Sequence, residues 1–356
     1  MTRVILVDPC CPAGYTLASL GRDPLGGTES TVLRVVGALA DSCAFTLYQA
    51  GRGQAEQDRM VRYLPLPHLA DVRLDDCDAL IVINAWKVAI KLRKRLPQRR
   101  IILWLHNYPG RHNRKMGPAL AAAGIEVVCV SRAHAMRLTG FLSTTCAALP
   151  DIGYIHNPIA DDLQPDATPV DRNRLLFASA PHKGLRQVYE SFARLRQAMP
   201  ELVLEVADPG YQRWDTGRVP DGVRVLGTLR HPDLVDRMRG ALCLFYPQTE
   251  FAETFGLVIA EANAVGTPAL VHAGLGANDE VVSSGGQCMD CGDVEAVAGR
   301  IRKWREIRPE VRGREQFRLS IVRQSWDRRL SCAHHDDKEW PKPTTASRQE
   351  GDAHVA

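Results

Sequence analysis

The sequence lacks any uninterrupted apolar run near the ~18 residues that a membrane-spanning helix needs. Before Asp8 it also lacks the apolar core of a signal peptide. The net charge is only +4, which gives no chain-wide basis for nucleic-acid binding. We therefore expect a cytoplasmic protein without a nucleic-acid partner, and a peripheral position at the inner face of the membrane stays open as an alternative.

Recognisable metal-binding patterns are also scarce. The ten cysteines are scattered and mostly lie in apolar runs, where a reduced thiol behaves as a small hydrophobic side chain. Cys288 and Cys291 form a C-x-x-C pair, but no second pair or histidine lies nearby at zinc spacing. The D-x-D pattern at 76–78 directly precedes an apolar strand, and the His-His-Asp-Asp run at 334–337 lies in a polar tail. We expect neither a metal nor a cofactor.

Although the G-x-G-x-x-G fingerprint of dinucleotide folds is absent, the chain alternates short apolar runs with helix-like stretches. This alternation is typical of α/β proteins with mostly parallel, doubly wound sheets. A stretch rich in Asp and Pro at 158–173 predicts a linker, so we expect one domain at 1–160 and a second at 161–316. The predicted strands are 4–7, 45–49, 61–66, 79–83, 101–105 and 126–130 in the first domain, and 175–178, 202–206, 223–226, 241–246, 269–272 and 286–289 in the second.

Two carboxylates, Glu253 and Glu261, lie eight residues apart around the start of a predicted helix at 256–264. If both were helical they would be about 12 Å apart along the axis. The sequence instead favours Glu253 in the preceding loop and Glu261 inside the helix. The amides of 254–256 would then be exposed at the positive end of the helix, where they favour phosphate. A phosphate site between two acids that can accept hydrogen bonds from hydroxyls suits a sugar nucleotide.

The run Glu253-Thr254-Phe255-Gly256, followed by Glu261-Ala262 and Gly266-Thr267-Pro268, resembles the E-x7-E element of retaining glycosyltransferases of family 4. The resemblance covers roughly residues 1–330. It implies the GT-B architecture, in which two Rossmann-like domains face each other. It also implies that a helix at 317–331 crosses back to the first domain, and we expect a disordered tail at 332–356. The implied reaction moves a sugar from a UDP- or GDP-sugar to a hydroxyl of a saccharide or lipid-linked acceptor, with retained configuration and without metal.

The resemblance also implies roles for single residues. Three are catalytic: Glu253 holds donor sugar hydroxyls, His106 orients the sugar from the opposite domain, and Lys183 reaches the diphosphate. Glu261 holds the ribose hydroxyls. The remaining donor-binding positions are Gly26, Gly27, Thr254, Phe255, Gly256, Leu257 and Glu280. The implied mechanism is a front-face substitution in which the leaving phosphate helps to deprotonate the acceptor.

One departure from the family pattern keeps other functions open. An arginine is expected a few residues before Lys183, but the chain has Ala178-Ser179-Ala180 there. The charge of the leaving group is then left to Lys183, the helix amides and Arg186. A non-catalytic nucleotide-sugar-binding subunit therefore remains an alternative. An epimerase or phosphorylase is another, because it would share the architecture.

The segment 86–100 contains seven basic residues and no acid. Up to Leu96 it can form a helix, with Trp86, Ile90 and Leu92 on an apolar side. Basic residues beside tryptophan are typical of helices that lie on anionic membranes, but a solvated connecting helix has the same pattern. We expect either an anionic membrane contact or such a connector.

Overall fold

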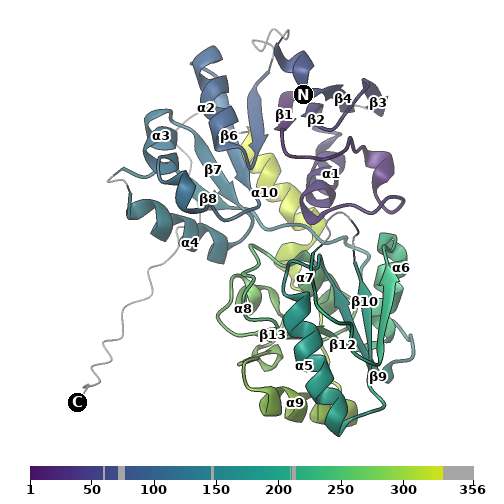
Figure 1. Ribbon diagram of the computed structural model, residues 1–356. Helices are drawn as coiled ribbons and strands as arrows, with labels where there is room; N and C mark the ends of the chain where they lie inside the picture. Colours follow the sequence, from purple (N-terminus) through teal and green to yellow (C-terminus); the bar gives the residue numbers. More distant parts are fainter. Residues whose placement is uncertain (59–60, 71–76, 146–147, 209, 211–213, 332–356) are drawn as a thin grey trace, which may run out of the picture.

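The computed structural model describes residues 1–58, 61–70, 77–145, 148–208, 210 and 214–331 and shows two lobes, each built on one sheet (Figure 1). The tail predicted at 332–356, with its run at 334–337, lies outside the described residues. Asp76 of the D-x-D pattern lies outside them as well.

The first lobe contains the strands β1 (Thr2–Asp8), β2 (Cys43–Gln49), β3 (Glu56–Asp58), β4 (Val61–Pro65), β5 (Ala79–Ile83), β6 (Arg100–Leu105), β7 (Glu126–Cys129) and β8 (Ile152–Tyr154). Their order in the sheet is β3-β4-β2-β1-β5-β6-β7-β8. Each described pairing is parallel except that of β3 with β4. The helices of this lobe are α1 (Gly27–Leu39), α2 (Trp86–Arg95), α3 (Met116–Ala122) and α4 (Arg132–Ser143), with short 3-10 turns η1 (Leu17–Ser19), η2 (Leu66–Ala70) and η4 (Arg111–Asn113).

Both faces of this sheet are buried, which explains why its strands are continuous apolar runs in the sequence. Along β1, Val4 and Leu6 join the core cluster that includes α1. The alternate residues Ile5 and Val7 join the cluster on the other face, which includes α2, α3 and α4. The predicted strands of the first domain are confirmed to within two residues at each end.

The second lobe contains the strands β9 (Asp171–Ala178), β10 (Val203–Ala207), β11 (Val223–Gly227), β12 (Ala241–Tyr246), β13 (Ala269–His272) and β14 (Cys288–Met289). Their order is β11-β10-β9-β12-β13-β14, and the described pairings are all parallel. The helices are α5 (Leu185–Ala198), α6 (His231–Gly240), α7 (Leu257–Ala264), α8 (Asn278–Val281) and α9 (Val294–Glu306), with 3-10 turns η5 (Gly285–Gln287) and η6 (Glu315–Phe317).

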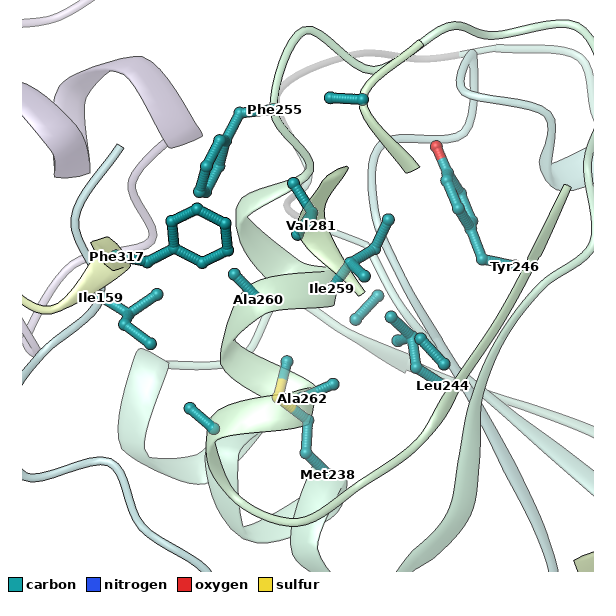
Figure 2. Packing of buried hydrophobic residues seen from close by; sticks show 14 of the residues in the cluster. Ile159, Met238, Leu244, Tyr246, Phe255, Ile259, Ala260, Ala262, Val281 and Phe317 are labelled. Atoms are coloured by element: carbon teal, nitrogen blue, oxygen red, sulfur yellow. The ribbon is translucent and has the colours of Figure 1, made fainter. Parts of the chain in front are cut away.

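The terminal helix α10 (Leu319–Ser331) returns to the first lobe and packs on α1. Trp326 of this helix lies against Trp104 of β6, with ring centroids 4.6 Å apart. Just before α10, Phe317 of η6 packs edge-on against Phe255 at 5.0 Å, and Figure 2 shows Ile159 of the linker beside them. The linker, the terminal helix and the segment before α7 therefore share one apolar cluster.

Two sequence predictions need correction. The apolar periodicity of 32–40 predicts a helix that begins near Val32, but α1 begins at Gly27, because its first turn is polar and gives no apolar periodicity. In α2 the expected apolar side does not face outward. Leu92 is buried, and Trp86 and Ile90 pack against the core of the first lobe.

Candidate functional site

Two adjoining cavities lie between the lobes, at the carboxyl ends of the strands, where open α/β sheets bind ligands. One has a volume of about 640 Å³ and the other about 1000 Å³. Both are lined by Gly26, Gly27, Lys183, Glu253 and Leu257. The paired glycines of the first domain thus face the predicted acidic and basic side chains of the second across one cleft.

The loop and helix around Gly256 have the arrangement that the sequence predicts. Gly256 immediately precedes α7, so Glu253 lies in the loop and Glu261 lies inside the helix. The backbone φ of Gly256 is +89°, and a Cβ there would meet Ile259 Cδ1 at 2.9 Å. Within the described chain, the amides of 254–256 donate no hydrogen bond. These amides are therefore available to an anion at the positive end of α7.

Glu253 and Lys183 point into the same cleft and bind each other. Lys183 Nζ lies 3.0 Å from Oε1 and 3.1 Å from Oε2 of Glu253. The hydroxyl of Tyr246 donates to the same Oε1 at 3.0 Å. Figure 2 shows that hydroxyl pointing away from the aliphatic core. Burial, together with the neighbouring Glu253 carboxylate, holds the pKa of Tyr246 well above its usual range, so it remains a hydrogen-bond donor.

Glu261 lies at the wall of the smaller cavity and is held by two basic side chains. Arg34 Nη2 donates to Oε1 at 2.7 Å, and His231 Nε2 lies 2.9 Å from the same oxygen. Burial alone would raise the pKa of Glu261, but Arg34 and His231 lower it to about 2. The carboxylate is therefore ionised at neutral pH.

His106 lines the larger cavity from the end of β6. Burial, reinforced by nearby His134, lowers its pKa to about 3, so the imidazole is neutral. Its Nε2 is buried without a hydrogen-bond partner, and so is Oδ1 of Asn157, which lines the same cavity. Thr254 Oγ1 donates to the His106 carbonyl at 2.8 Å, which ties this residue to the loop before α7.

Glu280 is the predicted site residue that the structure places elsewhere. It does not line either of the two cavities. Its carboxylate accepts the amides of Arg132 and Ala133 at the start of α4, at 3.0 and 2.8 Å, and His156 Nε2 lies 2.8 Å from Oε1. Instead of covering the cleft, this side chain joins the second domain to a helix of the first.

The position of the missing arginine stays without a cation. Ala178, Ser179 and Ala180 line the smaller cavity with small side chains. Arg186, the other predicted source of charge, has an exposed side chain paired with Glu190 and is absent from both cavity walls. Of the two predicted cations, only Lys183 faces the cleft.

Sequence reasoning missed four residues of this site: Arg34, His231, Tyr246 and Asn157. Arg34 offered a usable signal, because it is a single basic residue inside the apolar run 32–36 of α1. The other three carry no distinguishing pattern. Their part in the site depends on contacts between segments that are far apart in the sequence.

Comparison with known proteins bears on this site. Residues 162–317 match the family model of the glycosyl transferases group 1. The chain is also 33% identical over 128 residues to glycogen synthase of two Mycobacterium tuberculosis strains, a match that covers 34% of this chain and 30% of the relative. The chain thus spans under a third of the length of the curated relatives that it matches.

Solved structures match nearly the whole fold at low identity. Anabaena HepE, solved with UDP-glucose, has a TM-score of 0.66 at 14% identity and covers 93% of this chain and 100% of its own. AviGT4, a glycosyltransferase of avilamycin A biosynthesis, has a TM-score of 0.59 at 17% identity, with 93% and 97% covered. A trehalose-phosphate synthase of Burkholderia vietnamiensis has a TM-score of 0.63 at 12% identity, with 93% and 98% covered. The fold is GT-B, and the predicted fold class is confirmed.

Two features are absent from the described residues. No helix among these residues combines the length and apolar character needed to cross a membrane. No three His, Cys, Asp or Glu side chains in that part of the chain lie close enough together to hold a metal ion.

Proposed function

We propose that this protein is a retaining glycosyltransferase that moves a sugar from a UDP- or GDP-sugar to a hydroxyl of a saccharide or lipid-linked acceptor. The observation that carries the proposal is the shared position of Glu253 and Lys183. Both side chains line the two adjoining cavities, beside the amides that precede α7 and donate no hydrogen bond within the described chain. The match of residues 162–317 to the glycosyl transferases group 1 supports the same conclusion.

In the proposed sugar transfer, negative charge develops on the leaving diphosphate. The bond from the sugar anomeric carbon to the diphosphate oxygen breaks, and a bond from that carbon to the acceptor oxygen forms on the same face. The acceptor proton passes to the leaving phosphate oxygen. Lys183 and the amides of 254–256 stabilise the negative charge of the departing diphosphate, so the reaction needs no metal ion.

The ammonium of Lys183 forms an ion pair with Glu253. A diphosphate that enters the cleft offers Lys183 a second anionic partner and frees Glu253 Oε2 for sugar hydroxyls. Tyr246 still holds Oε1 in place. Glu253 can then accept a hydroxyl hydrogen bond without losing its orientation.

The larger cavity has the features of a sugar subsite. His106 and Asn157 line this cavity, and His106 Nε2 and Asn157 Oδ1 are buried without a hydrogen-bond partner. Buried polar atoms of this kind cost free energy unless a ligand or water satisfies them. Because His106 is neutral, its ring nitrogens pair with sugar hydroxyls rather than with a second anion.

Donor binding and turnover test this proposal. The purified protein should bind UDP or GDP in calorimetry and should release nucleotide from UDP-glucose or another sugar nucleotide of a panel, with equal rates with and without EDTA. Glu253→Gln should lower turnover by about 30- to 100-fold, because it removes a charge-assisted hydrogen bond, while the fold stays intact. Glu190→Gln, on the exposed face of α5, is the control and should keep wild-type turnover. Near wild-type turnover of Glu253→Gln would contradict the role assigned to it.

A non-catalytic nucleotide-sugar-binding subunit is the second candidate. The observation that favours it is the absence of a cation at 178–180, where only small side chains line the cavity. Tight binding of a sugar nucleotide without release of its nucleotide would support this function. Dependence of the reaction on free phosphate would instead indicate a phosphorylase.

A further inference from the structure

Arg34 connects three parts of the molecule that are distant in the sequence. Its helix, α1, belongs to the first domain, whereas Glu261 belongs to α7 of the second. Besides its bond to Glu261, the guanidinium donates through Nη1 to the carbonyl of Pro158 in the linker at 3.0 Å. The two side chains are only 9% and 5% exposed. A buried ion pair of this kind breaks only at a high cost, so it fixes the positions of its partners.

The bonds that hold Glu261 all go to one of its oxygens. Arg34 and His231 both contact Oε1, and within the described chain no side chain or amide donates to Oε2. Arg34 Nη2 also lies 3.2 Å from His231 Nε2, so the two basic side chains and Oε1 form one cluster. Glu261 lines the smaller cavity. One oxygen of a charged carboxylate is therefore fixed, and the other is left for a ligand.

We infer that Arg34 is a positioning residue for the donor: it holds Glu261 so that Oε2 accepts hydrogen bonds from the ribose hydroxyls of a nucleoside diphosphate. Because Arg34 belongs to the first domain and Glu261 to the second, full recognition of the ribose exists only while the two domains are closed on each other. This inference rests on the proposed function, since it assumes that a nucleoside diphosphate occupies the cleft.

Ribose discrimination is the readout that separates positioning from a merely structural role. Affinities for UDP and for 2′,3′-dideoxy-UDP are measured by calorimetry, with the corresponding guanine nucleotides in parallel. The wild type should prefer the ribonucleotide by about tenfold or more, the worth of a hydrogen bond to a charged group. Arg34→Ala should reduce this preference to less than about threefold, mainly by lowering the affinity for the ribonucleotide. Arg34→Lys should be intermediate, because it keeps the charge but not the paired geometry.

Arg323→Ala is the matched control. Arg323 of α10 also makes an ion pair with the first domain, at Asp41, but it lines neither cavity. It should keep the wild-type preference. Circular dichroism and thermal melting verify folding. If Arg34→Ala does not fold, Arg34→Met replaces it, because it keeps more of the side-chain volume and cannot donate to Glu261.

Three results overturn the inference. An undiminished ribose preference in a folded Arg34 variant shows that Arg34 does not act through Glu261. Equal losses of affinity for the ribonucleotide and the dideoxynucleotide show that Arg34 has a structural role alone. A wild type that binds UDP or GDP without ribose preference shows that Glu261 does not contact the ribose. A wild type that binds neither nucleotide is a different failure, because it refutes the proposed function and this inference together.

Discussion

Glu261 shows how a buried carboxylate is kept charged in the wall of a cavity. Its usual pKa of 4.5 falls to about 2 in the folded protein because the attraction of Arg34 and His231 exceeds the cost of burial. A carboxyl whose pKa is lower in the folded state binds fewer protons there than in the unfolded state. Its contribution to stability is therefore fully present above pH 4.5 and is lost as the pH falls towards 2.

Glu261→Gln should therefore flatten the acid dependence of the free energy of unfolding. Between about pH 5 and about pH 3.5, the wild type should lose about 1 kcal/mol that the variant does not lose. Urea unfolding at the two pH values measures this difference. Glu310→Gln, which removes an exposed carboxylate, is the control and should keep the wild-type slope. Identical slopes for wild type and Glu261→Gln would show that Glu261 has an ordinary pKa in the folded protein.

At the level of elements, the glycine-containing turn at 274–277 supports the backbone of Glu253. Gly276 has a φ of +60°, and a Cβ there would come within 2.4 Å of the Glu253 carbonyl oxygen. The next amide, of Ala277, donates to that same carbonyl at 2.9 Å. A glycine is therefore required at this position for the loop before α7 to keep its place.

Gly276→Ala should lower both stability and turnover. The positive φ costs an alanine about 1–2 kcal/mol, and the added methyl group pushes Glu253 away from Lys183 and Tyr246. Gly274→Ala is a matched control, because Gly274 also has a positive φ, of +73°, but has nothing within 4 Å of the added Cβ. Urea unfolding should show a loss for both variants, larger for Gly276→Ala because of the added contact with the Glu253 backbone, and only Gly276→Ala should lose turnover of the donor. Equal turnover of the two variants would show that this turn does not position Glu253.

The sequence predicted those parts of the fold that depend on local pattern. The strands β5, β12 and β13 have the predicted bounds, because a strand buried on both faces is a continuous apolar run between polar ends. The loop position of Glu253 and the helical position of Glu261 followed from their spacing. Short β3 could not be predicted, because its residues, Glu56–Asp58, are polar and its pairing is at a sheet edge.

Contacts between the domains could not be predicted from local sequence pattern. Arg34 and Glu261 are 227 residues apart, and the carboxylate of Glu280 is 147 residues from the amide of Ala133. Neither pair has a local pattern that relates one partner to the other. The resemblance places Glu280 over the donor, whereas the actual contact depends on how closely the two domains approach.

On the scale of the whole molecule, Glu280 holds the two domains together. It accepts two amides at the start of α4 and contacts His156, and its pKa is lowered despite burial by these hydrogen bonds. At the start of α4, the side chain of Ser131 accepts a hydrogen bond from the amide of His134. The helix therefore keeps a cap of its own, and the loss of Glu280 mainly affects the contact between domains.

Glu280→Ala should open the cleft. Small-angle scattering should show a larger radius of gyration, and the free energy of unfolding should fall by about 1–2 kcal/mol, as for the loss of a helix cap. Asp293→Ala is the matched control, since Asp293 caps α9 by accepting the amide of Ala296 at 2.9 Å within one domain. It should lose similar stability without a change in scattering. An unchanged radius of gyration for Glu280→Ala would mean that other contacts are enough to keep the cleft closed.

The surface of α2 gives a final prediction for the whole molecule. Because its apolar residues face the core, a membrane contact would depend on charge alone, through the exposed side chains of Lys87, Lys91 and Lys94. The neighbouring Arg93 and Arg95 donate to backbone carbonyls and are already occupied. The lysines follow each other at intervals of four and three residues, so they form one stripe along the helix.

Lys91→Gln with Lys94→Gln should weaken binding to vesicles that contain anionic phospholipid by about 30-fold. Each lysine near such a surface contributes about 1 kcal/mol. Co-sedimentation at low salt measures this affinity, and neutral phosphatidylcholine vesicles give the background. Arg302→Gln with Lys303→Gln removes the same charge from the exposed side of α9 and should leave binding unchanged. If both double variants bind like the wild type, the stripe is only a solvated helix surface, and a lipid-linked acceptor would have to reach the cleft without help from α2.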